Sequence, residues 1–85
     1  MSERPVPYRR RPTGVLAMPV TAENAEDVAR WCKGRAIRSP AGDITHVLVE
    51  THHGMAAAML GDWVIQGLEG EFYPCKNSVF IMTYE

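Results

Sequence analysis

The sequence lacks the features that mark several large classes of protein. None of its apolar runs approaches the roughly 18–20 residues that a membrane-spanning helix needs, and no signal peptide is recognisable. It has only two cysteines, Cys32 and Cys75, far fewer than a disulfide-stabilised scaffold uses. We therefore expect two free thiols and a cytoplasmic location, with no membrane as a partner.

A strong charge of either sign is also absent. Nine basic and ten acidic residues give a formal net charge of −1, so the chain as a whole does not attract nucleic acid or an anionic membrane. Hydrophobic residues make up 46% of the 85 residues and charged residues 22%, a balance typical of a folded domain. A chain of this length forms one domain at most.

No pattern of catalytic or metal-binding residues is visible. The sequence has no glycine-rich phosphate loop, no G-x-S-x-G elbow and no pair of carboxylates on one element. His46, His52 and His53, with the two cysteines, could supply zinc ligands, but none has the C-x2-C or H-x3-H spacing of a specific zinc site. We therefore predict no enzyme activity, no metal and no cofactor.

The first half of the chain predicts an arm, a strand and a helix. Residues 1–7 contain two prolines and little periodicity, which indicates a flexible N-terminal arm before a single domain over residues 8–85. Residues 13–20 fit an edge strand that ends at Pro19. A helix over residues 22–33 follows, with Thr21 as its N-cap and Lys33-Gly34 closing it. Its apolar stripe consists of Ala25, Val28, Ala29 and Cys32.

The second half predicts two hairpins and a terminal helix. Residues 39–43 form a loop by their turn residues, and residues 44–52 alternate as a strand. Residues 55–60 suit either a second strand, reached through a turn at His53-Gly54, or a helix. Residues 62–66 and 71–74 predict a hairpin, and residues 79–84 a short helix with Val79, Phe80, Thr83 and Tyr84 on one side.

These elements predict an α+β fold. One helix from the first half of the chain packs on a strongly twisted antiparallel sheet of four to five strands, and a short C-terminal helical turn closes the domain. We expect Val28 and Cys32 to share a single buried core with Trp63 and Phe72, because the helix stripe and the hairpin supply most of the apolar area.

Residues 61–85 resemble a family of short bacteriophage and prophage proteins. The segment reads GDWVIQGLEGEFYPCK, followed by Phe80 and the terminal Thr83-Tyr84-Glu85. The family's ends read like G-D-W/Y-I/V-I-x-G-V/L-x-G-E-F-Y-P-C-K, then F-x-x-T-Y-E. Most members are labelled hypothetical phage proteins, so the resemblance implies a phage origin and a fold rather than an activity. It leads us to expect a phage accessory protein, acting in the bacterial host cytoplasm, that binds a host or phage protein without chemistry of its own.

Two parts of the motif bear on chemistry. Cys75 lies beside Lys76 and near a helix start, an arrangement that can lower the pKa of a thiol. Gln66 and Glu69 stand where the family's hairpin usually carries lysines, which weakens any basic role of that hairpin. Gly67 and Gly70 are expected to supply backbone angles that other residues resist.

One basic segment offers an alternative function. Tyr8, Arg9, Arg10 and Arg11 could lie on phosphates, with the tyrosine stacking on a base, and Arg35 and Arg38 could extend that surface. The competing interpretation is a solvated strand start with no ligand. Nucleic acid is therefore the less favoured partner.

An apolar pair near the C-terminus predicts an interface. Ile81 and Met82 stand where the resembled family has polar or charged residues, and they lie opposite Phe80 on the expected helix. With Met55 and Met59 they could form an exposed apolar surface for a homodimer or a host protein. The alternative is that Ile81 folds into the core while Val79 faces outward.

Overall fold

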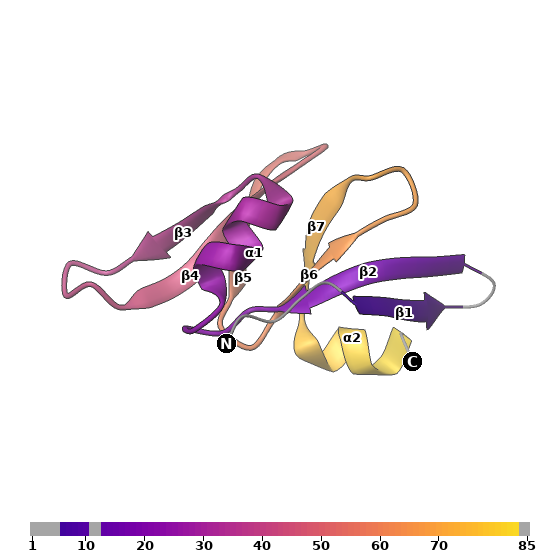
Figure 1. Cartoon of the computed structure of the whole chain (residues 1–85), viewed down its shortest axis with the longest axis horizontal. Coiled ribbons are helices and arrows are strands. Elements are labelled where there is room, and N and C mark those ends of the chain that lie inside the picture. Colours follow the sequence, from indigo (N-terminus) through magenta and orange to yellow (C-terminus); the bar gives the residue numbers. More distant parts are fainter. Residues whose placement is uncertain (1–5, 11–12, 84–85) are drawn as a thin grey trace.

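Seven strands and two short helices make up the described part of the chain (Figure 1). The structure is a computed structural model that describes the backbone of residues 6–10 and 13–83 and the side chains of residues 15–82. In chain order the elements are β1 (Val6–Arg10), β2 (Thr13–Pro19), α1 (Ala25–Cys32), β3 (Arg35–Arg38), β4 (Ile44–Thr51), β5 (Gly54–Met59), β6 (Trp63–Gln66), β7 (Phe72–Cys75) and α2 (Asn77–Thr83).

The strands form two antiparallel sheets, not the single sheet of four to five strands that the sequence predicts. One sheet has the order β1-β2-β6-β7 and the other the order β3-β4-β5. The predicted fold class, one helix on one sheet, is therefore wrong, because the described residues are mostly strand and both helices are short. β2 is not an edge strand, since β1 pairs along its outer side from Val6↔Ala17 to Arg10↔Thr13.

β1 and β3 are not predicted as separate strands, although a strand start at Tyr8 is one interpretation of the basic segment. β1 begins at Val6, inside the predicted arm, and β3 consists of Arg35-Ala36-Ile37-Arg38. Both are edge strands and both carry arginines. Charged residues are common on edge strands because they discourage pairing with other chains, and the same charges hide the strand from an apolar pattern.

α1 begins three residues later than the predicted residue 22, because Asn24 holds the preceding segment in a turn. The Asn24 side chain is buried; its Oδ1 accepts a hydrogen bond from the Thr21 backbone N–H at 2.8 Å, and its Nδ2 donates to the Pro19 carbonyl at 2.6 Å. Thr21 Oγ1 in turn accepts from the Asn24 N–H at 3.1 Å. Such side-chain bonds compete with the first helical turn. The predicted apolar stripe is confirmed, since all four of its residues are buried.

The hairpins follow the sequence more closely. The open alternative for residues 55–60 is settled as a strand, because β5 pairs with β4 from His46↔Met59 to Thr51↔Gly54. The predicted hairpin of β6 and β7 is confirmed, although only Gly70 of its two turn glycines has a positive φ, +85°. α2 begins at Asn77, two residues before the predicted helix. Neither described helix is long and apolar enough to cross a membrane.

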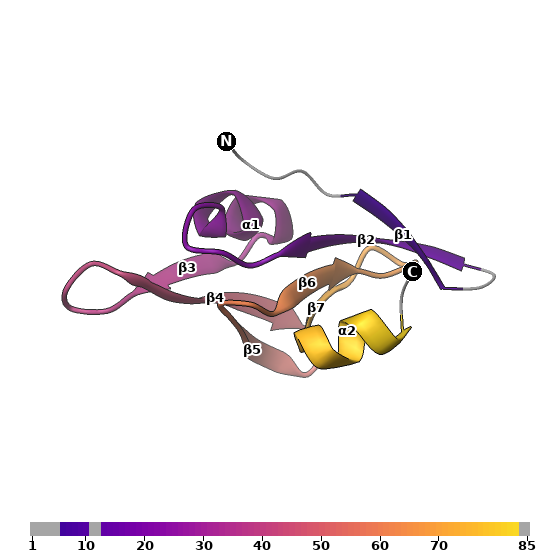
Figure 2. The same cartoon turned by 90° about the horizontal axis from the view of Figure 1, so that it is seen from below.

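β2 and β6 are buried on both faces, which gives the protein two apolar clusters. Figure 2 shows α1 and α2 on opposite sides of these strands. Met18 and Val64 enter the larger cluster with α1 and the β3-β4-β5 sheet, whereas Ala17 and Ile65 enter the smaller one with α2. The predicted single core is therefore wrong: Val28 and Cys32 lie in the larger cluster with Phe72 packed against it, but Trp63 packs against the smaller cluster.

Candidate binding surface

Trp63 of β6 holds α2 to the sheet through two contacts. Its ring stacks on the Phe80 ring, with centroids 3.9 Å apart and planes 9° apart. Its Nε1 donates a hydrogen bond to Asn77 Oδ1 at 2.9 Å. Phe80 is buried in the smaller cluster. These contacts fix which side of the seven-residue helix faces the sheet and which side faces solvent.

The free side of α2 exposes the apolar pair that the sequence singled out. Ile81 is 65% exposed and Met82 is 86% exposed, which confirms their predicted orientation. Val79 is 51% exposed, so its predicted place on the buried side is wrong. Neighbouring helix residues do not share a face, and the Trp63 stack selects Phe80. The Thr83 side chain and Tyr84 lie outside the described part.

β5 places two methionines on its outer face. Alternate residues of a strand point to the same face, so Met55, Ala57 and Met59 share the exposed face while Ala58 points into the larger cluster. Met55 is 55% exposed and Met59 is 43% exposed. Both predicted interface residues on this strand therefore lie at the surface.

Asp62 connects the end of β5 to the start of α2. Its Oδ2 accepts a hydrogen bond from the Met59 N–H at 3.1 Å and lies 3.5 Å from Nζ of Lys76, the residue before α2. The Met59 carbonyl accepts a further bond from the Asp62 N–H at 2.9 Å. In Figure 2, β5 and α2 lie along the same side of the molecule. We call the exposed side chains on these two elements the β5–α2 surface; it consists of Met55, Met59, Ile81 and Met82.

Sequence reasoning missed further exposed apolar residues. Leu60 follows Met59 directly and is exposed, and Leu68 is exposed at the β6–β7 turn. An apolar residue inside a predicted turn is the signal that could have found Leu68, because turn residues are usually at the surface. Leu60 continues the run of exposed apolar side chains past Met59, the last residue of β5.

The two thiols are not activated. Partial burial, followed by the negative charge of Asp62, raises the pKa of the Cys75 thiol, so the suggestion that Lys76 lowers it is wrong. Lys76 directs its ammonium group towards Asp62 instead. Burial also raises the pKa of Cys32, which confirms the interpretation of that residue as a small buried apolar side chain. Both cysteines are free, as predicted.

A pocket of about 330 Å³ lies beside the end of α1 and the β4–β5 and β6–β7 turns. Its lining residues are Cys32, Lys33, Glu50, Thr51, His52, Gly70, Glu71 and Phe72. The thiol among them is buried and has a raised pKa, so it is a poor nucleophile near neutral pH. Within the described part of the chain, no three His, Cys, Asp or Glu side chains are grouped to hold a metal.

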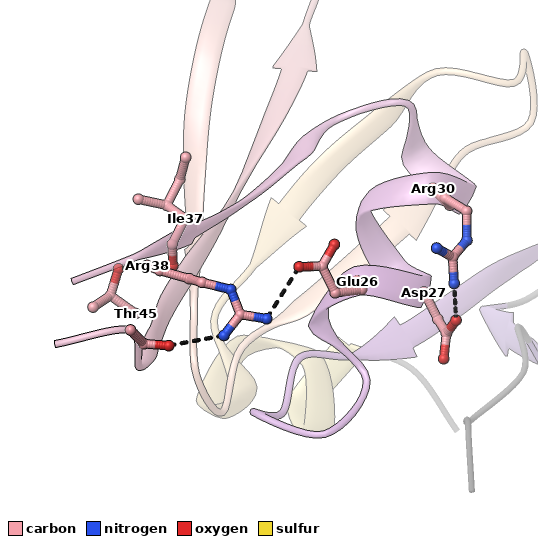
Figure 3. Close-up of polar contacts among 7 residues, drawn as sticks. Glu26, Asp27, Arg30, Ile37, Arg38 and Thr45 are labelled. Carbon is pink, nitrogen blue, oxygen red and sulfur yellow. Dashed lines mark hydrogen bonds and ion pairs between the residues drawn. The ribbon is translucent and has the colours of Figure 1, made fainter. Parts of the chain in front are cut away.

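Two arginines form ion pairs with carboxylates of α1 (Figure 3). Arg38 of β3 donates to Glu26 Oε2 at 3.2 Å and to the Gly42 carbonyl at 2.8 Å. Arg30 lies 2.5 Å from Asp27 Oδ1. Arg38 is therefore engaged within the protein rather than held ready for a phosphate.

The proposed basic arm falls largely outside the described side chains. Tyr8, Arg9 and Arg10 lie on β1, at the edge of its sheet, where the structure describes only their backbone. Arg11 lies outside the described residues. Nucleic-acid binding by these residues stays a prediction.

Comparisons with known proteins give no match. No known protein family, no curated protein and no solved structure matches the chain. The phage origin of the chain stays a prediction.

Proposed function

We propose that this chain is a small, non-catalytic protein-binding module whose partner docks on the β5–α2 surface. As the resemblance implies, it would be a bacteriophage or prophage accessory protein in the bacterial host cytoplasm. The partner would be a host or phage protein. This function requires no cofactor and no reaction.

The exposure of Ile81 and Met82 carries the proposal. A single exposed apolar residue is ordinary on a protein surface, whereas adjacent large apolar residues mark association surfaces more often. The Trp63–Phe80 stack anchors the opposite side of α2, so these two side chains cannot turn inward without losing that contact. Methionine suits a docking surface because its flexible thioether adapts to the shape of a partner.

Charge substitution on α2 tests the proposal. Ile81→Lys combined with Met82→Glu should weaken retention of a protein partner from bacterial lysate, because a charged side chain resists burial in an apolar interface. The melting temperature should stay nearly unchanged, since surface substitutions usually change stability little. Leu68→Lys is the matched control, because Leu68 is equally exposed but lies on the β6–β7 turn.

Two results would contradict the proposal. Unchanged retention in the α2 variant, or an equal loss with Leu68→Lys, would remove the special role of this surface. Retention of nucleic acid instead of protein, lost when Arg9, Arg10 and Arg11 become alanine and falling steeply with added salt, would establish the alternative function.

A further inference from the structure

The outer edge of β5 exposes backbone groups of alternate residues. β5 is the last strand of its sheet and pairs with β4 alone. The turn between these strands has two residues, so the flanking pair Thr51↔Gly54 is a hydrogen-bonded pair, and such pairs recur at every second position. Gly54, Ala56 and Ala58 therefore bond to β4, while the N–H and C=O groups of Met55, Ala57 and Met59 point away from it.

Asp62 occupies only one of these three positions. The Met59 N–H donates to Asp62 Oδ2, and the Met59 carbonyl accepts from the Asp62 N–H. The corresponding groups of Met55 and Ala57 have no partner among the described residues. The edge thus presents two adjacent positions at which a further strand could form a full set of backbone bonds.

β5 also lacks the protection that the other edge strands carry. Proteins block unpaired edges with charged residues, prolines, bulges or short strands. Each of the other three edges has such features: Pro7, Arg9 and Arg10 on β1, Arg35, Arg38 and an irregularity after Ile37 on β3, and Pro74 within the four residues of β7. The β5 sequence, GMAAAM, contains no charge and no proline, and its pairing with β4 shows no shift in register.

We propose that β5 pairs with β5 of a second copy of this chain, antiparallel and centred on Ala56. In this register Met55 of one copy faces Ala57 of the other, and the reverse, so each facing pair exchanges two backbone hydrogen bonds. Every free group on the edge is then satisfied. The two three-stranded sheets join into one six-stranded sheet around a two-fold axis.

The neighbouring residues select this register. A pairing centred on Ala57 would need the Met59 backbone groups, which Asp62 already occupies. A pairing centred on Met55 would need the His53 N–H, which donates to Thr51 Oγ1 at 3.1 Å. Only the pairing centred on Ala56 uses free groups throughout.

The chemistry of β5 favours a second copy as its occupant. In a two-fold pair the same strand meets itself, so a charge on the strand would lie close to its like. β5 has none, so two copies of the strand meet no like-charge repulsion when they pair. This inference concerns the backbone edge of β5 and does not depend on the proposed function, which concerns side chains on β5 and α2.

Sedimentation velocity over a range of concentrations tests the pairing. The wild-type chain should shift from a mass of 9.5 kDa towards twice that value as concentration rises. Met55→Lys with Ala57→Lys places like charges opposite each other in the proposed register, and Met55→Glu with Ala57→Lys places opposite charges there. The first variant should dimerise about tenfold more weakly than the second, because the charges in both facing pairs repel each other in the first variant and attract each other in the second.

Amide hydrogen exchange supplies an independent readout. The Met55 and Ala57 amides should exchange more slowly as the dimer forms, whereas the Met59 amide should change little because Asp62 already binds it. A wild-type chain that stays monomeric, or equal dimerisation of the two charge variants, would overturn the proposal. So would a dimer that persists in both variants and is lost with Ile81→Lys and Met82→Glu, which would place the contact on α2.

Discussion

At the scale of single residues, Gly34 is under the tightest steric constraint of the described glycines. A Cβ atom at this position would lie 2.0 Å from the Leu48 carbonyl oxygen of β4, and that oxygen cannot move without shifting the strand. Gly34 is not among the residues with positive φ; Lys33 adopts the left-handed conformation instead, with φ 59°. The predicted Lys33-Gly34 helix end is therefore present, but glycine is required there for space rather than for its backbone angle.

Gly34→Ala should lower the free energy of unfolding by about 1–3 kcal/mol or more, as overpacking against a fixed group does. Urea denaturation measures the loss. Gly42→Ala is the control, because φ at Gly42 is +95° and nothing lies within 4 Å of a Cβ there. Its strained backbone angle alone should lower the free energy of unfolding, by about 1 kcal/mol. An equal loss in both variants would mean that β4 does not restrict Gly34.

Cys75 provides a test of local charge. Its raised pKa keeps the thiol protonated at neutral pH, so alkylation by iodoacetamide should be slower than for an unstructured cysteine and should accelerate only as pH rises above the ordinary thiol range. Asp62→Asn removes a negative charge that disfavours the thiolate. That variant should have a lower Cys75 pKa and react faster at pH 8, as measured by mass spectrometry. Fast alkylation of the wild type at pH 7 would show that Lys76 governs the thiol after all.

Among the elements, α2 is anchored by the stack of Phe80 on Trp63. Phe80→Ala removes the ring that lies on Trp63 and should lower the free energy of unfolding by about 3–5 kcal/mol, with faster amide exchange throughout α2. Val79→Ala is the matched control on the same helix, and it should cost little because Val79 is half exposed. Equal losses in the two variants would show that α2 is not anchored through Phe80.

An element can be predicted from the sequence when the residues that define it lie close together in the chain. β4, β6 and β7 are recognisable because alternation and turn glycines lie within a few residues of each other in sequence, whereas the run of alanines in β5 also suits a helix. β1 and β3 are not recognisable as separate strands. An edge strand such as β3 pairs on one side only, and its charged residues give it the polar composition of a loop. The start of α1 was also hidden, because nothing in the sequence shows that Asn24 reaches back to the Pro19 carbonyl.

At the scale of the whole molecule, β2 and β6 connect the two apolar clusters. Adjacent residues of β2, Ala17 and Met18, point into different clusters, and Val64 and Ile65 of β6 do the same. Neither cluster can lose its packing without disturbing the strands that form one wall of the other. The protein should therefore unfold in a single cooperative transition.

Each cluster has its own tryptophan, which makes this cooperativity measurable. Trp31 packs against the larger cluster and Trp63 against the smaller. In Trp31→Phe and in Trp63→Phe, the fluorescence of the remaining tryptophan should follow the same urea transition as the far-ultraviolet circular dichroism of that variant. Met18→Ala, which removes a fully buried side chain, should lower the midpoint of both signals equally. Separate transitions for the two tryptophans would show that the clusters fold independently.

The candidate surface was partly readable from the sequence. Ile81 and Met82 could be placed on the free side of a helix because helical spacing is local and Phe80 is the residue best suited for burial. The exposure of Val79 could not be predicted, because the orientation of α2 depends on the Trp63 ring. Trp63 lies fourteen residues before Asn77, the α2 residue to which it also donates a hydrogen bond. The free edge of β5 was equally hidden, since the position of a strand within a sheet is set by which strands pair with it.

The sequence by itself determined local features of this protein: the apolar stripe of α1, the β6–β7 hairpin and the free thiols. Each depends on residues close together in the chain, where helical and strand periodicities act. Only the tertiary structure decided that the strands divide into two sheets and that Trp63 and Val28 lie in different clusters. It also decided that burial, with the charge of Asp62 second, raises the pKa of Cys75. These outcomes depend on groups brought together from distant positions, and their distances are fixed by packing rather than by sequence spacing.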